Sequence, residues 1–271
     1  MTPQEFAAVA ELALKRAGLV FTPDKTYLVE SRLRTLLRRR ALGSPTELIA
    51  AIRRDRDLAG EVVDALVNSE TSFFRDKAPF EMLRDKVVPE LLAPGARGPI
   101  RVWSAACATG QEPYSIAMTL DGGLARRDPG FDILGTDISE GCIRAAREGR
   151  YTEFEMRRGL GPPDKARYFE LVDGGWRARQ PLRDMLRWRT FNLLDDAAGL
   201  GVFEIVFCRN VLIYFDTATR RRVLENICKV LAPAGFLFVG ASETMFAFSD
   251  LFAPMPGAPG VYRPTARRAA A

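Results

Sequence analysis

The sequence predicts an α/β fold in which a Rossmann-like sheet follows an N-terminal all-α domain and carries a small inserted β-subdomain. Residues 1 to about 90 show helical patterns and little strand signal, whereas apolar strand-like runs alternate with amphipathic stretches after residue 99. Such alternation is typical of βαβ units and a mainly parallel sheet. We expect a helical domain over residues 1–75, a linker helix over 76–98 and the sheet domain over 99–271.

The N-terminal segment MTPQEFAAVAELALKRAG predicts an amphipathic helix and not a signal peptide. No basic residue precedes its apolar positions, and Glu11 and Lys15 interrupt them. No apolar run in the sequence is long enough to span a membrane. The four cysteines lie far apart with no CxxC pair, which predicts reduced thiols, no metal site and a cytoplasmic location.

A second helix is predicted in the segment TYLVESRLRTLLRRRALG, which begins at Thr26. Its apolar face holds Val29, Leu33, Leu36 and Leu37. Four arginines flank this face on a helical wheel, namely Arg32, Arg34, Arg38 and Arg39. They form either a solvated rim around a packed helix or a docking surface for an acidic helix or nucleic acid.

Four apolar runs predict the strands of the sheet, at residues 100–105, 131–137, 203–210 and 235–242. Amphipathic helices are predicted between or beside these runs, at residues 113–120, 140–148 and 219–232. The segment 151–190 breaks the alternation, because RYFELV, a Gly174-Gly175 turn and WRAR have the pattern of a hairpin. We expect this segment to be the inserted β-subdomain.

The composition limits the chemistry, because the 271 residues include no histidine. This excludes Ser-His-Asp and Cys-His nucleophilic sites, zinc sites built from histidine and any histidine general base. The net charge of +5 favours nucleic acid, anionic lipid or an acidic protein as a partner, without choosing among them.

The stretch RVWSAACATGQEPYSIAM runs from a predicted strand through a loop of small residues into a helix. Its single glycine, Gly110, matches neither a dinucleotide fingerprint nor a P-loop. Glu112 would repel pyrophosphate and attract a cation, while Asp137 ends the next strand where a ribose diol is often bound. The pair suits S-adenosylmethionine, a nucleoside sulfonium. Alternatively, Glu112 is a first-turn helix acid and Asp137 a turn residue.

A further motif, VNSETSFFRD, places Phe73 and Phe74 side by side between hydroxyl groups and Arg75. One interpretation is a helix start whose two rings enter the core. The other is a lid that packs one ring on a ligand and directs the arginine at its chemistry.

Five blocks occur in order along the chain: ETSFFRD, CATGQEPYSIAM, LGTDIS, FNLLD and FCRNVLIYFD. With these blocks the sequence resembles the chemotaxis receptor glutamate methyltransferases, the CheR family, over nearly its whole length. The resemblance implies a Rossmann-like class I methyltransferase sheet and methyl transfer from S-adenosylmethionine to glutamate side chains of chemoreceptors. The products would be glutamate γ-methyl esters and S-adenosylhomocysteine, and no metal is implied.

The resemblance also implies roles for individual residues. Cofactor contacts are expected from Ser69, Thr71, Phe74, Arg75, Glu112, Asp137, Asn192, Leu193, Arg209 and Asn210. Ser69 stands where the family usually has Asn, and Asn68 lies one residue early. Arg75 and Tyr214 are the catalytic candidates, although Tyr214 could equally be a buried aromatic that follows a strand.

The expected partner is the helical cytoplasmic domain of a chemoreceptor, bound through the four arginines of the second helix. We expect a monomer that neither binds nucleic acid nor inserts into a membrane. A nucleic-acid methyltransferase would suit the basic charge, but RNVLIYF stands where an N-P-P-Y-like motif would be expected. A non-catalytic binding module that keeps the fold is the other alternative. The short connection around Asp173-Gly174-Gly175 predicts that no receptor tail peptide is clamped by the hairpin.

Overall fold

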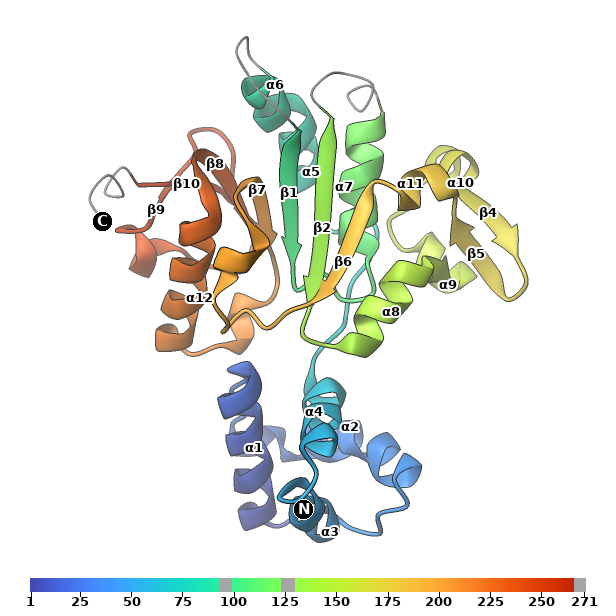
Figure 1. The fold of residues 1–271 in the computed structure, drawn as a ribbon, viewed down its shortest axis with the longest axis vertical. Coiled ribbons are helices and arrows are strands. Elements are labelled where there is room, and N and C mark those ends of the chain that lie inside the picture. Colours follow the sequence, from blue (N-terminus) through green and yellow to red (C-terminus); the bar gives the residue numbers. More distant parts are fainter. Residues whose placement is uncertain (93–98, 123–129, 266–271) are drawn as a thin grey trace. The chain divides into compact units, whose positions relative to one another are not determined.

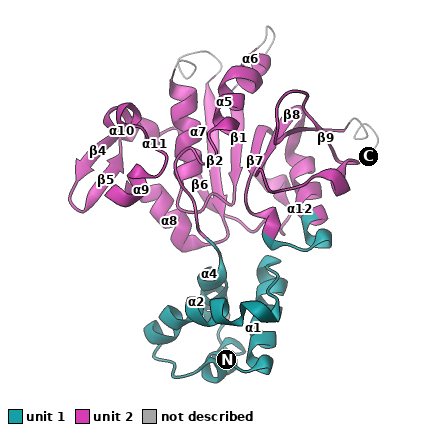
Figure 2. Cartoon of the chain, turned by 180° about the vertical axis from the view of Figure 1, so that it is seen from behind, with its two compact units in different colours: residues 1–68, 214–220 teal, residues 69–213, 221–271 magenta. Residues whose placement is uncertain are grey.

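The computed structural model describes residues 1–92, 99–122 and 130–265 (Figure 1). The chain separates into two compact units, which Figure 2 distinguishes by colour. The first unit contains residues 1–68 and 214–220, and the second contains residues 69–213 and 221–271. Each unit is described by itself below.

The first unit is all-helical in its N-terminal part. Its helices are α1 (Pro3–Ala17), α2 (Thr26–Arg39), α3 (Pro45–Ile52) and α4 (Arg56–Leu66), with a 3-10 turn at Pro23–Lys25. Side-chain caps start three of them: Thr2 caps α1, Ser44 caps α3 and Asp55 caps α4. The predicted apolar face of α2 is confirmed by the burial of Val29, Leu33 and Leu36.

The second unit is built on a seven-stranded sheet in the order β6-β2-β1-β7-β8-β10-β9. The strands are β1 (Ile100–Ala105), β2 (Phe131–Asp137), β6 (Leu186–Thr190), β7 (Phe203–Cys208), β8 (Leu231–Val239), β9 (Phe252–Pro254) and β10 (Val261–Pro264). The first five pair in parallel, and the antiparallel pairs that the structure describes within this sheet are β8 with β10 and β10 with β9. The parallel core confirms the predicted α/β sheet and brings the carboxyl ends of its strands to one edge.

The helices of the second unit pack around its seven-stranded sheet (Figure 1). The N-terminal part of this unit contributes α5 (Ala78–Met82), a π-helical turn (Leu83–Val87) and α6 (Val88–Leu91). The crossover helices are α7 (Gln111–Asp121), α8 (Glu140–Glu148) and α12 (Thr217–Val230), and 3-10 turns occur at Ala197–Leu200, Leu212–Tyr214 and Phe246–Phe248. Most of α7 is buried, which explains why its sequence is apolar on nearly all sides.

The predicted hairpin is confirmed as part of a separate three-stranded sheet, ordered β3-β5-β4. It contains β3 (Arg150–Tyr151), β4 (Phe169–Val172) and β5 (Gly175–Ala178), with α9 (Glu153–Arg157), α10 (Pro162–Tyr168) and α11 (Gln180–Arg183) around it. Val172 pairs with Gly175, so Asp173 and Gly174 form the two-residue turn. The short strand β3 was not foreseen, because two residues carry too little alternation to be recognised.

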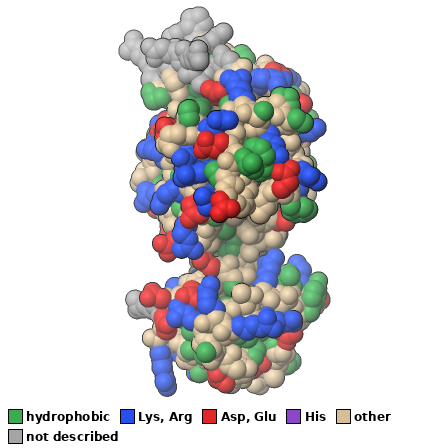
Figure 3. Space-filling model, turned by 90° about the vertical axis from the view of Figure 1, so that its right-hand side faces the viewer, with side chains coloured by type: hydrophobic (Ala, Val, Ile, Leu, Met, Phe, Trp, Pro, Cys, Tyr) green, Lys and Arg blue, Asp and Glu red, His purple; other side chains and the backbone are tan. Residues whose placement is uncertain are grey.

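None of the described helices combines the length and the apolar character needed to cross a bilayer. On the face drawn in Figure 3, Lys and Arg side chains are interspersed with Asp and Glu side chains. The positive net charge is therefore not gathered into a single basic patch on that face.

Candidate active site

The loop after β1 is built from strained backbone. Ala106, Ala108 and Gly110 all have positive φ, at 59°, 49° and 96°. A Cβ on Gly110 would lie 2.8 Å from the Cβ of Ala146 and 3.1 Å from the indole of Trp188, so only glycine fits there. Alanine in this conformation costs free energy that the surrounding fold must supply, and such strain tends to mark functional sites.

Asp137 holds this loop from the end of β2. Its carboxylate is 4% exposed and accepts hydrogen bonds from the amides of Ala108 and Ser139, both at 2.9 Å. Burial raises the pKa of Asp137 above its usual value, and the amide hydrogen bonds only partly oppose this effect. Each carboxylate oxygen has more than one acceptor position, so both can still accept from a ligand hydroxyl.

Glu112 lies in the first turn of α7 and is engaged on both carboxylate oxygens. Ser104 of β1 donates its hydroxyl to Oε1 at 2.8 Å, and Arg209 donates Nη1 to Oε2 at 2.9 Å. The side chain is 13% exposed, so it lies at the boundary between protein and open space. The position therefore does more than complement a helix dipole, because its charge belongs to a network.

Arg209, at the end of β7, is the centre of that network. Its Nη2 donates to the Asp76 carboxylate at 2.8 Å and to the Arg75 carbonyl at 3.0 Å. The side chain is 1% exposed, and its buried Nε has no hydrogen-bond partner within the described chain. Asp76 and Glu112 thus share one guanidinium, so two carboxylates are paired with a single positive charge.

Glu243 shapes the turn that carries Arg209. Its buried carboxylate accepts from the amides of Asn210 (2.9 Å), Val211 (2.9 Å), Leu212 (2.8 Å) and Gly240 (2.6 Å). Asn210 itself has a φ of 59°, a conformation that Asn tolerates better than most residues. Four charge-assisted hydrogen bonds hold the turn in this strained shape.

The two adjacent phenylalanines have different environments. Phe73 is fully buried, with its ring centroid 5.0 Å from that of Tyr151 and 5.4 Å from that of Phe169 in edge-to-face contacts. Phe74 has a φ of 47°, and its amide donates to the Ser115 hydroxyl at 2.9 Å. Phe73 therefore lies in the core, whereas Phe74 is only partly buried against it, and the lid interpretation stays a prediction.

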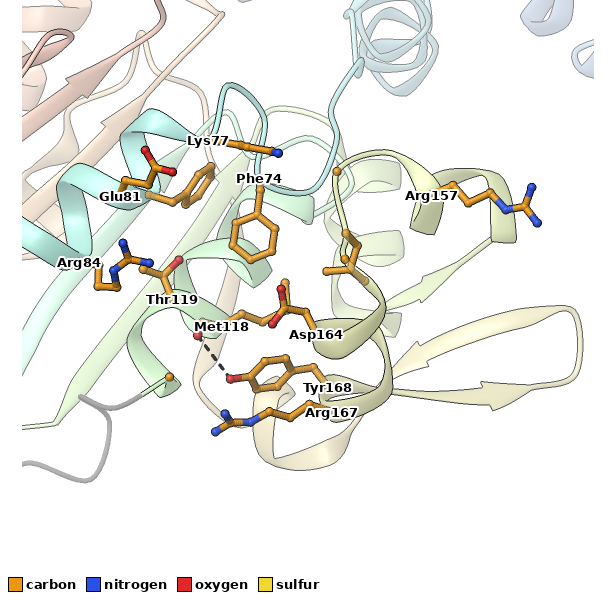
Figure 4. Close-up of a pocket in the computed structure, with 15 residues that line it drawn as sticks. Phe74, Lys77, Glu81, Arg84, Met118, Thr119, Arg157, Asp164, Arg167 and Tyr168 are labelled. Atoms are coloured by element: carbon orange, nitrogen blue, oxygen red, sulfur yellow. Dashed lines mark hydrogen bonds between the residues drawn. The ribbon is translucent and has the colours of Figure 1, made fainter.

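The Phe74 ring points into a cleft of about 890 Å³, shown in Figure 4. Its walls come from α5, the end of α7, the 157–161 loop and α10, and they include Lys77, Arg84, Arg167 and Tyr168. Neither Glu112 nor Asp137 lines this cleft. None of residues 106–112, the loop after β1 that is called the acid loop below, lines this cleft either.

Asn192 and Leu193 follow β6, where the Phe191 amide donates to the Asp137 carbonyl at 2.9 Å. The Asn192 side chain accepts from the Leu194 amide at 3.0 Å, and Leu193 is buried. The carboxyl edge of the sheet therefore brings together Glu112, Asp137, Arg209 and Asn210, with the 191–194 loop beside Asp137.

The remaining predicted site residues are not among those gathered at the carboxyl edge of the sheet. Ser69 is exposed and Thr71 half-buried at the start of the second unit. Arg75 is half-buried and donates Nη1 to the Glu70 carbonyl at 3.1 Å. Tyr214 belongs to the first unit, where its hydroxyl accepts from the Asn68 side-chain amide at 2.5 Å. Asn68, which the motif places one residue early, thus has a defined partner.

The four arginines of α2 divide into two pairs. Arg32 donates to the Leu66 carbonyl, and Arg39 pairs with Glu61 at 2.7 Å. Arg34 and Arg38 are exposed and have no acidic partner among residues the structure describes. As residues four apart on one helix, they share a face.

The described residues contain no His, Cys, Asp and Glu grouping suited to a metal ion. None of the four cysteines, all of which lie in the described ranges, forms a disulfide, and burial raises the thiol pKa of Cys107 and Cys208 well above the usual value. These two thiols are consequently poor nucleophiles.

Sequence reasoning missed three residues that organise the site, namely Asp76, Ser104 and Glu243. Asp76 directly follows the FFR motif and Ser104 is a polar residue in an otherwise apolar strand, so both offered a local signal. Glu243 offered none, because three of its four partners lie about thirty residues away in the chain.

Comparison with known proteins accounts for nearly the whole chain. The family model described as CheR methyltransferase, SAM binding domain, matches residues 69–261, and the CheR methyltransferase all-alpha domain matches residues 4–67. Chemotaxis protein methyltransferase 1 of Pseudomonas aeruginosa is 41% identical over 253 residues, covering 91% of this chain and 92% of that protein.

Two further similar proteins are also chemotaxis protein methyltransferases. Chemotaxis protein methyltransferase Cher2 of Pseudomonas putida is 40% identical over 91% of this chain and 92% of its own length. A chemotaxis protein methyltransferase of Vibrio parahaemolyticus is 37% identical over 96% of each chain. The predicted resemblance and fold class are confirmed: the chain belongs to the CheR methyltransferase family, with an all-α domain followed by an S-adenosylmethionine-binding methyltransferase domain.

Proposed function

We propose that this protein transfers a methyl group from S-adenosylmethionine to glutamate side chains of chemoreceptors in the cytoplasm, forming γ-methyl esters. The observation that carries the proposal is the acid loop, where Arg209 pairs with Glu112 and Asp137 accepts from the Ala108 amide, within a domain of the S-adenosylmethionine-binding kind. The names of the relatives support a role in chemotaxis.

The residues present fit this cofactor. The excess of carboxylates around Arg209 favours a ligand with a positive centre, as a sulfonium and an ammonium group provide. Asp137 retains acceptor positions for ribose hydroxyls, and the unpartnered Nε–H of Arg209 can donate to a ligand carboxylate. Asn192 and Leu193 would frame the base from the loop beside Asp137.

When bound, the cofactor supplies an activated methyl group. The protein does not need to activate the nucleophile, because a glutamate carboxylate with an ordinary pKa of about 4.3 is already ionised at pH 7. No general base is needed, in agreement with a sequence that lacks histidine. Orientation of the two reactants and exclusion of water are then the main contributions, and good orientation can supply about 7–11 kcal/mol.

Arg75 is the proposed anchor for the incoming carboxylate. Its backbone carbonyl is held by Arg209, which also holds Glu112, so the residue is tied to the acid loop. A guanidinium grips a carboxylate through two parallel hydrogen bonds and would aim one oxygen at the methyl group. Tyr214 is proposed to assist through its hydroxyl, which Asn68 holds in place.

Receptor docking is proposed for the arginines of α2, with Arg34 and Arg38 as the principal contacts. Both are exposed without an acidic partner within the described ranges, and a receptor helix that presents several glutamates would offer them one. Arg32 and Arg39 already have partners in the first unit and would contribute less.

A labelling experiment tests the proposal. The protein is incubated with methyl-labelled S-adenosylmethionine and either a chemoreceptor from the same organism, DNA or RNA. We expect label on the receptor, released as methanol by mild base, because esters hydrolyse where N-methyl groups do not. Base-stable label, or transfer to nucleic acid alone, would instead support the amino-methylating alternative, and no transfer would support a binding module.

A further inference from the structure

A second cleft in the methyltransferase domain is lined mainly by arginine and other polar side chains. A cleft of about 440 Å³ lies where α8, α11 and β6 meet. It is lined by Arg147, Gln180, Arg183, Asp184, Leu186, Arg187 and Trp188. No residue of the acid loop lines it, so it is separate from the site described above.

The guanidinium groups of this cleft are not all neutralised. Arg187 forms an ion pair with Asp132. Arg147 donates to the Trp188 carbonyl at 3.4 Å, and Arg183 donates to the Gln180 side chain. Within the described part of the chain, neither Arg147 nor Arg183 has a carboxylate within ion-pair distance. Asp184, which accepts from the Gln180 side chain, is the acid among the residues named above, so the cleft is lined by three arginines and one carboxylate.

Arg183 also has a polar atom that the protein leaves unsatisfied. Its Nε is buried and has no hydrogen-bond partner among the described residues, and the same is true of Nε in Arg177 on β5. A buried donor without an acceptor is destabilising, and an anion that accepts from Arg183 would relieve this.

One wall of the cleft is rigid and borders the acid loop. The Trp188 indole packs against Gly110 and Gly135, where an added Cβ would lie 3.1 Å and 2.6 Å from ring atoms. Its ring is 5.6 Å from that of Tyr114, between ring centroids. Because the indole is fixed by these contacts, the cleft has a preformed flat wall beside its arginines.

We propose that this cleft binds a phosphate group, held between Arg147 and Arg183 against Trp188. Phosphate carries a charge of about −1.5 to −2 near pH 7, which matches two unpaired guanidinium groups. Its tetrahedral oxygens accept from two forks at once, and the buried Nε of Arg183 supplies one further donor. The phosphate comes either from the free anion or from a small phosphate ester.

Calorimetric titration at fixed ionic strength tests this site with inorganic phosphate and with phenyl phosphate. We expect saturable binding of at least one of them. Arg147→Gln and Arg183→Gln should each weaken binding about tenfold, because each variant loses charge-assisted hydrogen bonds to the phosphate. Arg144→Gln is the matched control, because Arg144 is exposed on the same helix and does not line the cleft.

The two ligands distinguish the two sources. Tighter binding of phenyl phosphate would identify an ester whose organic part contacts the Trp188 wall, and equal binding would identify the free anion. The proposal is overturned if neither ligand saturates at several millimolar, or if Arg144→Gln weakens binding as much as Arg147→Gln. A glutamate-rich peptide that binds more tightly than both through the same arginines would also overturn it. Thermal unfolding of each variant verifies that the fold is kept.

Discussion

The guanidinium of Arg209 lies 2.9 Å from the carboxylate of Glu112 and, through its other terminal nitrogen, 2.8 Å from that of Asp76. It also holds the carbonyl of Arg75, and so connects the acid loop after β1 to the segment that follows the phenylalanine pair. Because Arg209 and Glu112 are both largely buried, the contact between them is shielded from solvent and salt, whereas the Asp76 carboxylate is 46% exposed. The cofactor candidates and the catalytic candidate Arg75 are thereby joined by one side chain.

Removal of either acid should weaken cofactor binding while leaving the fold intact. Glu112→Ala and Asp137→Ala should each reduce the affinity for S-adenosylmethionine at least about tenfold, which corresponds to about 1.4 kcal/mol. Calorimetric titration measures this affinity. Unchanged affinity in both variants would show that Glu112 and Asp137 do not bind the cofactor.

Cofactor affinity should depend on pH through Asp137. Burial raises the pKa of this carboxyl, so affinity should fall on acidification at a pH above the ordinary Asp value of about 3.9. Asp137→Asn should bind weakly at every pH and lack this transition. Stability should change in the opposite sense: a raised folded-state pKa favours the folded protein at low pH, and this contribution is lost as pH rises through it. A wild-type affinity that is flat across this range would contradict the role of Asp137.

Arg75→Ala should reduce turnover more than cofactor affinity, because the proposed task of Arg75 is to aim the receptor carboxylate. Arg75→Lys should restore little, since a point charge does not replace the planar fork. Single-turnover rates at saturating cofactor, compared with titrated affinities, separate the two effects. A collapse of affinity with the saturated rate preserved would make Arg75 a cofactor ligand instead.

The quadruple variant with Arg32, Arg34, Arg38 and Arg39 replaced by Ala should raise KM for receptor at low salt without changing cofactor affinity. The double variant Arg34→Ala/Arg38→Ala should account for most of this increase, because these two arginines have no acidic partner in the described structure. Each exposed contact is worth less than about 1 kcal/mol, so the pair matters more than either member. An unaltered KM for receptor in the quadruple variant would show that these arginines do not bind the receptor and are only a solvated rim around the packed helix.

The hairpin should not clamp a receptor tail peptide. Its turn consists only of Asp173 and Gly174, which leaves no additional backbone to surround a ligand. The outer edge of β4 could still accept a strand by backbone pairing, and Leu171 on this strand is 73% exposed. Titration with C-terminal receptor pentapeptides should show no micromolar binding. Micromolar binding that is lost when the turn is disrupted would show that the strand edge is used.

The sequence by itself determined which segments form the sheet and which residues its loops display. The runs at 100–105 and 131–137 coincide with β1 and β2, because strand periodicity and length are local properties. The apolar face of α2 was likewise visible from helical spacing. The positions of Glu112 and Asp137 followed from the strands they come after, since parallel strands end at one edge.

Only the tertiary structure decided which side chains meet. Arg209 and Glu112 are 97 residues apart, and no local period relates them. The two phenylalanines have the same chemistry, yet Phe73 enters the core and Phe74 lines a cleft, because the positive φ of Phe74 turns the chain at that residue. Among the arginines of α2, partners such as Glu61 come from another helix. Periodicity encodes burial, whereas a polar side chain finds its partner only when packing brings distant segments together.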